Sequence, residues 1–290
     1  MAKMAFKTER KTRTPRKTAA TKVMEVDNTV VESTETDAEI VERLRKRFEI
    51  LDTMTQMTID GVVKGMVVTG PPGVGKSFGV EAVLEKNSSF DKLAGNRLKF
   101  GVEKGAASAI GLYKLLYNYA DRGHVLVLDD CDSVLYDETS LNLLKAALDS
   151  SKKRRISWNT DSALLRREGI PDSFEFKGAV IFITNLKFDK VRGKIKDHLD
   201  AIMSRCHYLD LTMDTPREKI LRCRQIVADG MLNEYDFTKE QETEIVDFIS
   251  NNQHRMREVS LRMVTKVADL RKSMSDKWER MAECTCMVRR

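Results

Sequence analysis

The sequence lacks the features that mark membrane, secreted and zinc-binding proteins. It has no run of about 18 apolar residues, so a membrane-spanning helix is not expected. The first residues lack an apolar core, so a secretory signal peptide is not expected either. The five cysteines form no CxxC pair and have no histidine at zinc-ligand spacing. These absences favour a cytoplasmic protein with reduced cysteines and no membrane association, although Cys284 and Cys286 leave metal binding or oxidation open.

The composition that is present is that of a soluble globular protein. The chain has 290 residues, 41% of them hydrophobic and 32% charged, enough for one sizeable core and a smaller second domain. The net charge of +6 is uneven, because a basic start is followed by an acidic stretch before residue 43. Residues 1–37 are predicted to be a disordered arm. Its basic part either binds nucleic-acid phosphates or is a solvated tail without a partner.

Beyond the arm, the hydrophobic pattern predicts an α/β core and then a helical lid. A helix is expected to begin near Asp37, and short apolar runs then alternate with helical stretches, as in βαβ units around a parallel sheet. Strands are expected at 66–68, 98–100, 125–128, 180–183 and 207–211. Helices without strands follow near 216–232, 239–250 and 255–274. The predicted boundaries are 38–212 for the core, 213–283 for the lid and 284–290 for a tail.

Residues 70–77 form the pattern GxxxxGKS between a predicted strand and a predicted helix. Glycines let backbone N–H groups turn inward around phosphates, and the helix start adds partial positive charge. In such a loop Lys76 reaches the β- and γ-phosphates, and the Ser77 hydroxyl coordinates Mg²⁺. The sequence therefore predicts a site for a nucleoside triphosphate and magnesium. The predicted binding residues are Gly70, Pro71, Pro72, Gly73, Val74, Gly75, Lys76, Ser77 and Phe78.

The predicted strand at 125–128 ends in two carboxylates, Asp129 and Asp130. Asp129 is expected to hold the magnesium ion with Ser77, through its water shell, and Asp130 to polarise the attacking water. Most ATPases with this pattern carry Glu at the second position. The shorter Asp130 therefore leaves a slow nucleotide switch open beside ordinary turnover. Asp132 is interpreted as a helix cap or a surface charge.

Further positions resemble the AAA+ superfamily of ATPases. Asn185 follows the predicted strand at 180–183 and matches sensor 1, which orients the lytic water in that superfamily. The segment 204–206, Ser-Arg-Cys, is similar to the SRC segment of clamp-loader subunits. This similarity implies that Arg205 reaches the ATP of a neighbouring subunit, with Arg192 as a weaker alternative. In the lid, Arg257 best matches sensor 2, and Arg255 is the second choice.

The resemblance covers residues 40–275 and implies an AAA+ P-loop core with a small C-terminal all-α lid. It also implies an enzyme that hydrolyses ATP with Mg²⁺ as a homo-oligomer, often a hexameric ring in the family. Small single-module AAA+ proteins of large bacteriophages look most similar, which would place the chain in the host cytoplasm. The second predicted strand is not followed by the aromatic-apolar-Gly trio of protein unfoldases, so threading of polypeptides is not favoured.

An insert at 151–178 lies between a predicted helix that ends near Ser150 and Asn185. It resembles the pre-sensor hairpin or loop of several AAA+ branches. Its basic run 152–155 either meets a nucleic-acid backbone, with Trp158 stacking on a base, or is a solvated charge run with Trp158 buried. The leading functional hypothesis is an oligomeric motor or loader on nucleic acid. The alternatives are a remodeller of protein complexes and a slow ATP-dependent switch.

Overall fold

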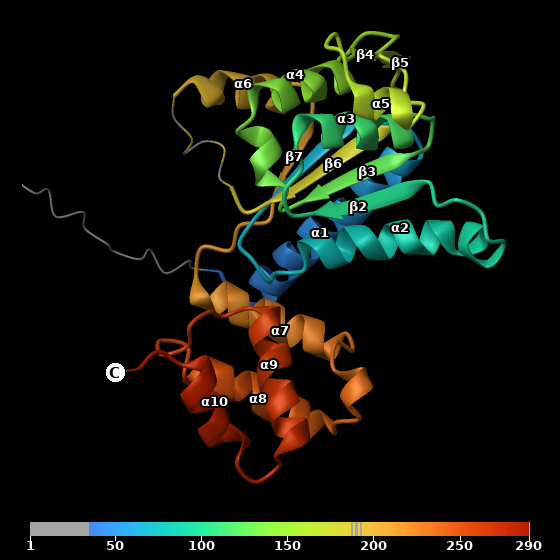
Figure 1. Cartoon of the computed structure of the whole chain (residues 1–290). Coiled ribbons are helices and arrows are strands. Elements are labelled where there is room, and N and C mark those ends of the chain that lie inside the picture. The colour runs from blue at the N-terminus through green and yellow to red at the C-terminus, as the bar shows by residue number, and fades with distance from the viewer. Residues whose placement is uncertain (1–34, 187, 189–190, 192, 290) are drawn as a thin grey trace, which may run out of the picture. The chain divides into compact units, whose positions relative to one another are not determined.

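The computed structural model describes residues 35–186, 188, 191 and 193–289. Five parallel strands form one sheet in the order β2-β3-β6-β1-β7 (Figure 1). The predicted α/β class with a central parallel sheet is confirmed. Four strands coincide with the predicted runs, whereas the second lies further along the chain than 98–100. The bounds are β1 Gly65–Thr69, β2 Phe100–Lys104, β3 Val125–Asp129, β6 Ala179–Thr184 and β7 His207–Asp210.

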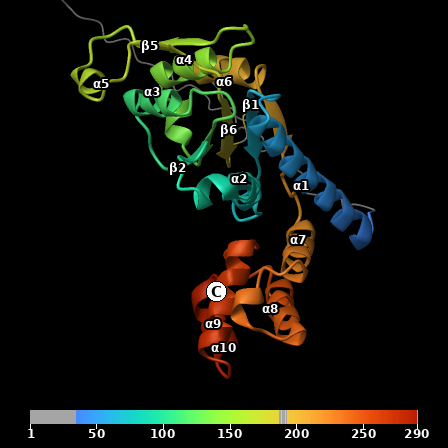
Figure 2. The same ribbon diagram turned by 90° about the vertical axis from the view of Figure 1, so that its right-hand side faces the viewer.

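Helices cover both faces of the sheet, because successive strand side chains point to opposite faces. In β1, Met66 and Val68 pack into the core under α1 and α2, whereas Val67 packs into the core under α3, α4 and α6. Figures 1 and 2 show these two layers on either side of the strands. The bounds are α1 Asp37–Ile59, α2 Lys76–Leu93, α3 Ala109–Asn118, α4 Glu138–Ala147 and α6 Lys194–Met203, with a 3₁₀ turn at Asp132–Leu135.

The predicted helix near Asp37 is confirmed, and its start is fixed by a side-chain cap. The Thr36 hydroxyl accepts a hydrogen bond from the Glu39 backbone N–H, and the Glu39 carboxylate accepts one from the Thr36 N–H. The rest of the predicted N-terminal arm, residues 1–34, lies outside the described residues. No helix of the described part of the chain is long and apolar enough to cross a membrane.

The insert forms a two-stranded antiparallel pair, which agrees with the hairpin of the two expected forms, hairpin or loop. Its elements are β4 Arg155–Ser157, α5 Ala163–Arg167 and β5 Ser173–Glu175. Trp158 is half-buried and packs against Tyr113 of α3, with ring centroids 5.6 Å apart. The indole therefore stabilises the insert on the core, and stacking of Trp158 on a base stays a prediction.

The lid has four helices in place of the three that were expected. They are α7 Pro216–Ala228, α8 Lys239–Asn251, α9 Leu261–Ser273 and α10 Trp278–Cys286, with a 3₁₀ turn at Asn233–Tyr235. α9 begins at Leu261 rather than near residue 255, because the Ser260 hydroxyl accepts a hydrogen bond from the Met263 N–H and caps the helix. The predicted tail boundary at 283 falls inside α10, and Met287 beyond it is buried in the lid core.

Candidate functional site

The phosphate loop of residues 70–77 connects β1 to α2 at the carboxyl end of the sheet. Gly73 and Gly75 have φ angles of +70° and +102°, which L side chains rarely adopt. A Cβ on Gly73 would also lie 2.8 Å from the Cβ of Ser260 in the lid. Gly75 stands at the N-cap of α2 and supplies no side-chain cap, so the first N–H groups of the helix remain for an anion.

Lys76 is the buried cation of the loop, with 6% of its surface exposed. Its ammonium donates hydrogen bonds to the carbonyl oxygens of Gly70 (2.8 Å) and Pro71 (2.9 Å), and to Oδ1 of Asn185 (2.8 Å). Burial lowers the pKa of Lys76 to about 8, although the nearby carboxylates of Asp130 and Asp129 oppose this shift. The negative charge of a bound phosphate group would stabilise the protonated form of this buried ammonium.

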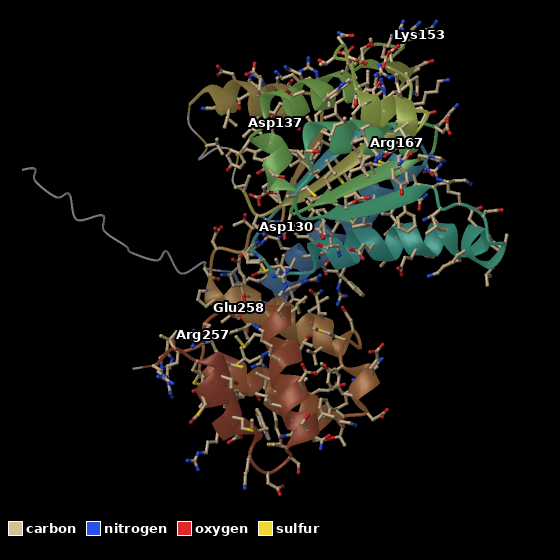
Figure 3. All side chains as sticks on the ribbon, viewed as in Figure 1. Asp130, Asp137, Lys153, Arg167, Arg257 and Glu258 are labelled. Atoms are coloured by element: carbon tan, nitrogen blue, oxygen red, sulfur yellow. The ribbon has the colours of Figure 1, made fainter. Side chains whose placement is uncertain are left out.

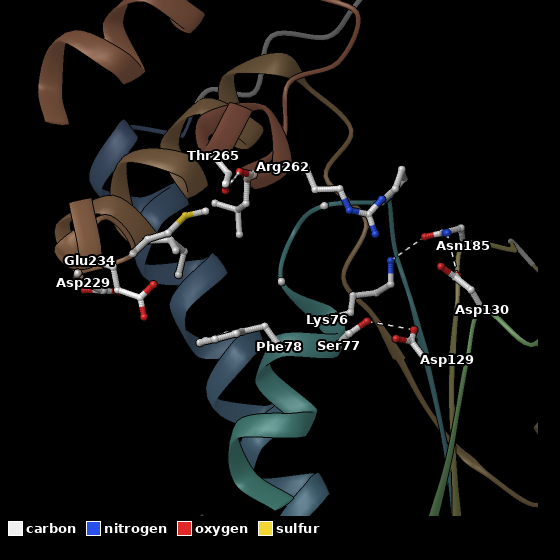
Figure 4. A pocket seen from close by; sticks show the side chains of 17 residues that line it. Lys76, Ser77, Phe78, Asp129, Asp130, Asn185, Asp229, Glu234, Arg262 and Thr265 are labelled. Carbon is white, nitrogen blue, oxygen red and sulfur yellow. Dashed lines mark hydrogen bonds between the residues drawn. The ribbon is translucent and has the colours of Figure 1, made fainter. Parts of the chain in front are cut away.

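Ser77 and Asp129 lie together where magnesium was predicted. The Ser77 hydroxyl donates a hydrogen bond of 3.0 Å to Oδ1 of Asp129, which is buried at the end of β3 (Figure 4). A hydroxyl and a carboxylate are hard oxygen donors, so these residues fit Mg²⁺. Sequence reasoning missed Lys104, the neighbour of Asp129 in the β2–β3 register, whose Nζ lies 3.6 Å from Oδ2 of Asp129. Lys104 also pairs with Glu81 of α2.

Asn185 joins Lys76 to Asp130. Its amide donates a hydrogen bond of 3.0 Å to Oδ1 of Asp130, while its oxygen accepts from Lys76, as Figure 4 shows. Asp130 is exposed and has a φ of +52°, an unusual backbone conformation for a residue other than glycine. The structure thus brings the predicted residues Lys76, Ser77, Asp129, Asp130 and Asn185 to one place.

Asp132, interpreted from sequence as a cap or surface charge, is half-buried at the start of the 3₁₀ turn. The Thr184 hydroxyl donates a hydrogen bond of 2.6 Å to its Oδ1. Burial raises the pKa of Asp132, and this hydrogen bond partly opposes the rise. Asp132 therefore anchors the turn that follows Asp130 to the end of β6.

A cavity of about 600 Å³ opens beside the phosphate loop, between the core and the lid. The loop lines one part of it, and α7, α9 and the segment between α7 and α8 line the rest. Phe78, 78% exposed, extends from the start of α2 toward Asp229 and Glu234 (Figure 4). The other lid residues of the lining are Ile226, Gly230, Met231, Leu261, Arg262 and Thr265. The cavity thus combines a cationic, N–H-rich end with an apolar region bordered by carboxylates.

The sequence predicted that the lid contributes Arg257 to the site, but the lid arginine that lines this cavity is Arg262. Arg262 is the second residue of α9 and its positive charge contributes to the lowered pKa of Lys76. Next to it, the Leu261 N–H donates a hydrogen bond of 2.8 Å to the Gly73 carbonyl, which ties α9 to the phosphate loop.

Arg257 is exposed, and its backbone N–H bonds to the Cys286 carbonyl in the lid. Figure 3 shows it away from Asp130, and neither Arg257 nor the second choice, Arg255, lines the cavity. The prediction is wrong because the Ser260 cap starts α9 after these residues. Ser260, directly before the apolar-periodic run that starts at Leu261, was the sequence feature that could have located Arg262.

Arg205 does not line the cavity of its own chain. It follows α6, is exposed, and its Nη1 donates a hydrogen bond of 2.6 Å to the carbonyl of Ala201. An exposed arginine outside the chain's own site is what a role in a neighbouring site requires. Arg192, the weaker alternative, lies outside the described residues.

The chain is similar to a known protein family and to a curated relative. Residues 66–205 match the model of the ATPase family associated with various cellular activities (AAA). An uncharacterized 36.7 kDa protein from the nrdC–mobD intergenic region of Enterobacteria phage T4 is 34% identical over 244 residues. This match covers 83% of this chain and 73% of the relative.

Among solved structures, the chain is similar to a DNA replication initiation factor (TM-score 0.46) and to AMPPCP-bound DnaA from Aquifex aeolicus (TM-score 0.49), each with 13% identity. The matches cover 84% and 82% of this chain, respectively. The chain spans 65% of the first of these structures and 66% of the second.

Proposed function

The chain belongs to the AAA family of ATPases, and we propose that it binds ATP with Mg²⁺ and hydrolyses it in an assembly of copies that acts on nucleic acid. The observation that carries the proposal is the hydrogen-bonded series Lys76–Asn185–Asp130 beside the Ser77–Asp129 pair. These groups supply a phosphate-binding cation, a metal-binding oxygen pair and a carboxylate for water at one end of a cavity large enough for a nucleotide.

In this proposal the phosphate loop and Lys76 bind the β- and γ-phosphates, and Ser77 and Asp129 hold the magnesium ion. A bound magnesium ion would neutralise charge on the phosphates. Asp130 orients the attacking water and accepts its proton, and Asn185 keeps the Asp130 carboxylate in place. The base occupies the apolar region of the cavity, where the exposed Phe78 ring offers a stacking surface.

Two arginines complete the site. Arg262 of the same chain reaches the γ-phosphate from α9, since it lines the cavity on the side of Lys76. Arg205 acts in the site of a neighbouring copy, since it is exposed and does not line its own cavity. A permanently charged guanidinium suits this role because it stabilises the transferred phosphoryl group only when copies are assembled.

The nucleic-acid part of the proposal is supported by exposed cations of the insert, Lys152 and Lys153, together with the basic residues before position 24. Arg154 of the same run is buried and donates hydrogen bonds to the carbonyls of Ala147 and Gly178, so the expectation that all four residues 152–155 meet a phosphate backbone is corrected for Arg154.

A slow nucleotide switch is the second candidate, because Asp130 has a short side chain and is already held by Asn185. A motor and a switch differ in steady-state ATP hydrolysis measured across protein concentration, with and without single- and double-stranded DNA. A motor on nucleic acid requires a rate per subunit that rises with concentration and increases further with DNA. A low rate that ignores DNA, with ADP retained at one per chain, would favour the switch. A rate stimulated only by a protein partner would favour a remodeller.

The assembled site is tested with Arg205→Ala. ATP affinity should be unchanged, while turnover should fall by a factor on the order of 10³. Mixing Arg205→Ala with Lys76→Ala should restore part of the activity, because a Lys76→Ala subunit still supplies Arg205 to an intact neighbouring site. Arg280→Ala, which removes another exposed arginine, should keep full turnover. Normal hydrolysis by Arg205→Ala would disprove the shared site.

A further inference from the structure

The amino ends of three neighbouring strands carry a row of cations, opposite the phosphate loop. Lys64 directly precedes β1, and Lys177 and Arg122 lie two and three positions before β6 and β3. Because β3, β6 and β1 are adjacent and parallel, these positions share one edge of the sheet. All three residues line a groove of about 360 Å³. Figure 3 shows Lys153 of the neighbouring insert at the opposite end of the core from Asp130.

The insert adds two more cations to the same groove, Lys152 and Arg154. Arg154 has only 6% of its surface exposed and lies over the ring of Phe176, with 5.1 Å from Cζ to the ring centroid. Its Nη1 and Nη2 donate hydrogen bonds of 2.8 Å to the carbonyl oxygens of Ala147 and Gly178. The guanidinium is thus held rigidly in the wall of the groove by neutral partners, so it adds positive charge to the groove without extending to a phosphate itself.

The groove has an excess of positive charge that the surrounding residues do not balance. Glu175 is its only acidic lining residue among those described, and it lies 3.6 Å from the Nζ of Lys177. Asp149 acts on Arg154 only through its charge. In the described part of the chain, Lys64, Arg122, Lys152 and Arg154 form no ion pair. A row of cations with so little compensating charge is suited to an extended polyanion.

We propose that this groove binds the phosphodiester backbone of a nucleic acid. The proposal rests on the nucleic-acid part of the proposed function and assigns it a surface. A protein partner is less suited, because the apolar residues of the lining, Val63, Phe176 and Ala179, are at most 2% exposed and offer no apolar contact. The groove contacts phosphates and sugars rather than bases, so binding is independent of sequence.

The test compares two double variants of the full chain with the same change in net charge. Arg122→Gln/Lys177→Gln removes two exposed groove cations, and Lys86→Gln/Lys92→Gln removes two exposed cations of α2. The affinity for fluorescent single-stranded DNA is measured by anisotropy over a range of salt concentrations. The groove variant should bind about tenfold more weakly. Its slope of log K against log salt should be shallower by about 1.4, since each phosphate contact contributes about 0.7. The α2 variant should keep the wild-type slope.

ATP hydrolysis without DNA and the melting temperature should be unchanged in both variants, which excludes misfolding as the cause. If the wild-type chain binds DNA and the groove variant keeps the same slope, the groove assignment is overturned and the proposed function stands. If the wild-type chain does not bind nucleic acid, the nucleic-acid function fails and the groove assignment fails with it. If poly-L-glutamate competes as strongly, per charge, as unlabelled DNA does, the proposal is overturned. The ligand of the groove would then be an acidic polypeptide and not a nucleic acid.

Discussion

The carboxyl ends of the parallel strands lie at one edge of the sheet and their amino ends at the opposite edge, called here the carboxyl edge and the amino edge. These two edges carry positive charge in different ways. At the carboxyl edge, Lys76 is buried, donates three hydrogen bonds and has carboxylates beside it. At the amino edge, Arg122 and Lys177 are exposed and only one carboxylate, Glu175, lies among the described lining residues. A buried, hydrogen-bonded cation fixes the position of one small anion, whereas exposed cations in a row attract a long one. If the proposed functions hold, one sheet would bind a nucleotide at one edge and a polymer at the other.

The largest expected effect separates the two edges directly. Lys76→Ala should weaken ATP binding by more than about a hundredfold, because the loop loses the cation that neutralises the phosphates. Binding is measured by titration calorimetry with Mg²⁺ present. The same variant, without nucleotide, should keep the wild-type salt dependence of DNA binding, because the amino edge is unchanged.

Lys86→Ala is the matched control, since Lys86 is an exposed lysine of the same helix. It should retain full ATP affinity. Wild-type ATP affinity in Lys76→Ala would remove the phosphate-loop assignment. A changed DNA salt slope in Lys76→Ala would mean that the two edges do not act separately.

A smaller effect tests which lid residue belongs to the carboxyl edge. Arg262→Ala should weaken ATP binding by about thirtyfold, as expected for one lost hydrogen bond between charged groups. Arg257→Ala removes an arginine from the same part of the lid, but outside the cavity, and should change ATP affinity less than twofold. Equal effects of the two substitutions would show that Arg262 has no special role, and a larger effect of Arg257→Ala would restore the sequence prediction.

The carboxyl edge could be predicted from sequence because its residues follow strands that are easy to recognise. The motif at residues 70–77 and the carboxylates after 125–128 each adjoin an apolar run, and parallel strands bring such ends together. Asn185 was predicted from the family resemblance, and it forms hydrogen bonds with both Lys76 and Asp130. Arg262 was missed because its position depends on where α9 begins, and helix boundaries are the least certain part of a pattern.

The amino edge could not be predicted, because its residues share no motif. Lys64, Arg122 and Lys177 are scattered along the chain and come together only through the strand order of the sheet. The basic run of the insert was visible in the sequence, but its four residues have different environments. Arg154 is buried and Lys152 is exposed, and this difference depends on the packing of β4 against α4. Tertiary contacts therefore decide which charges can meet a ligand.

The smallest effect is a pH dependence of ATP binding that arises at the carboxyl edge alone. In the free protein, burial lowers the pKa of Lys76 to about 8, and bound phosphates favour the protonated form and raise that pKa. ATP affinity should therefore be constant below about pH 7 and fall by up to about tenfold toward pH 9. Calorimetry in two buffers with different ionisation enthalpies should detect uptake of about three quarters of a proton near pH 8.5. Proton release on binding, or no exchange, would mean that Lys76 is already fully charged in the free protein and that the hydrogen bonds to Gly70, Pro71 and Asn185 outweigh its burial.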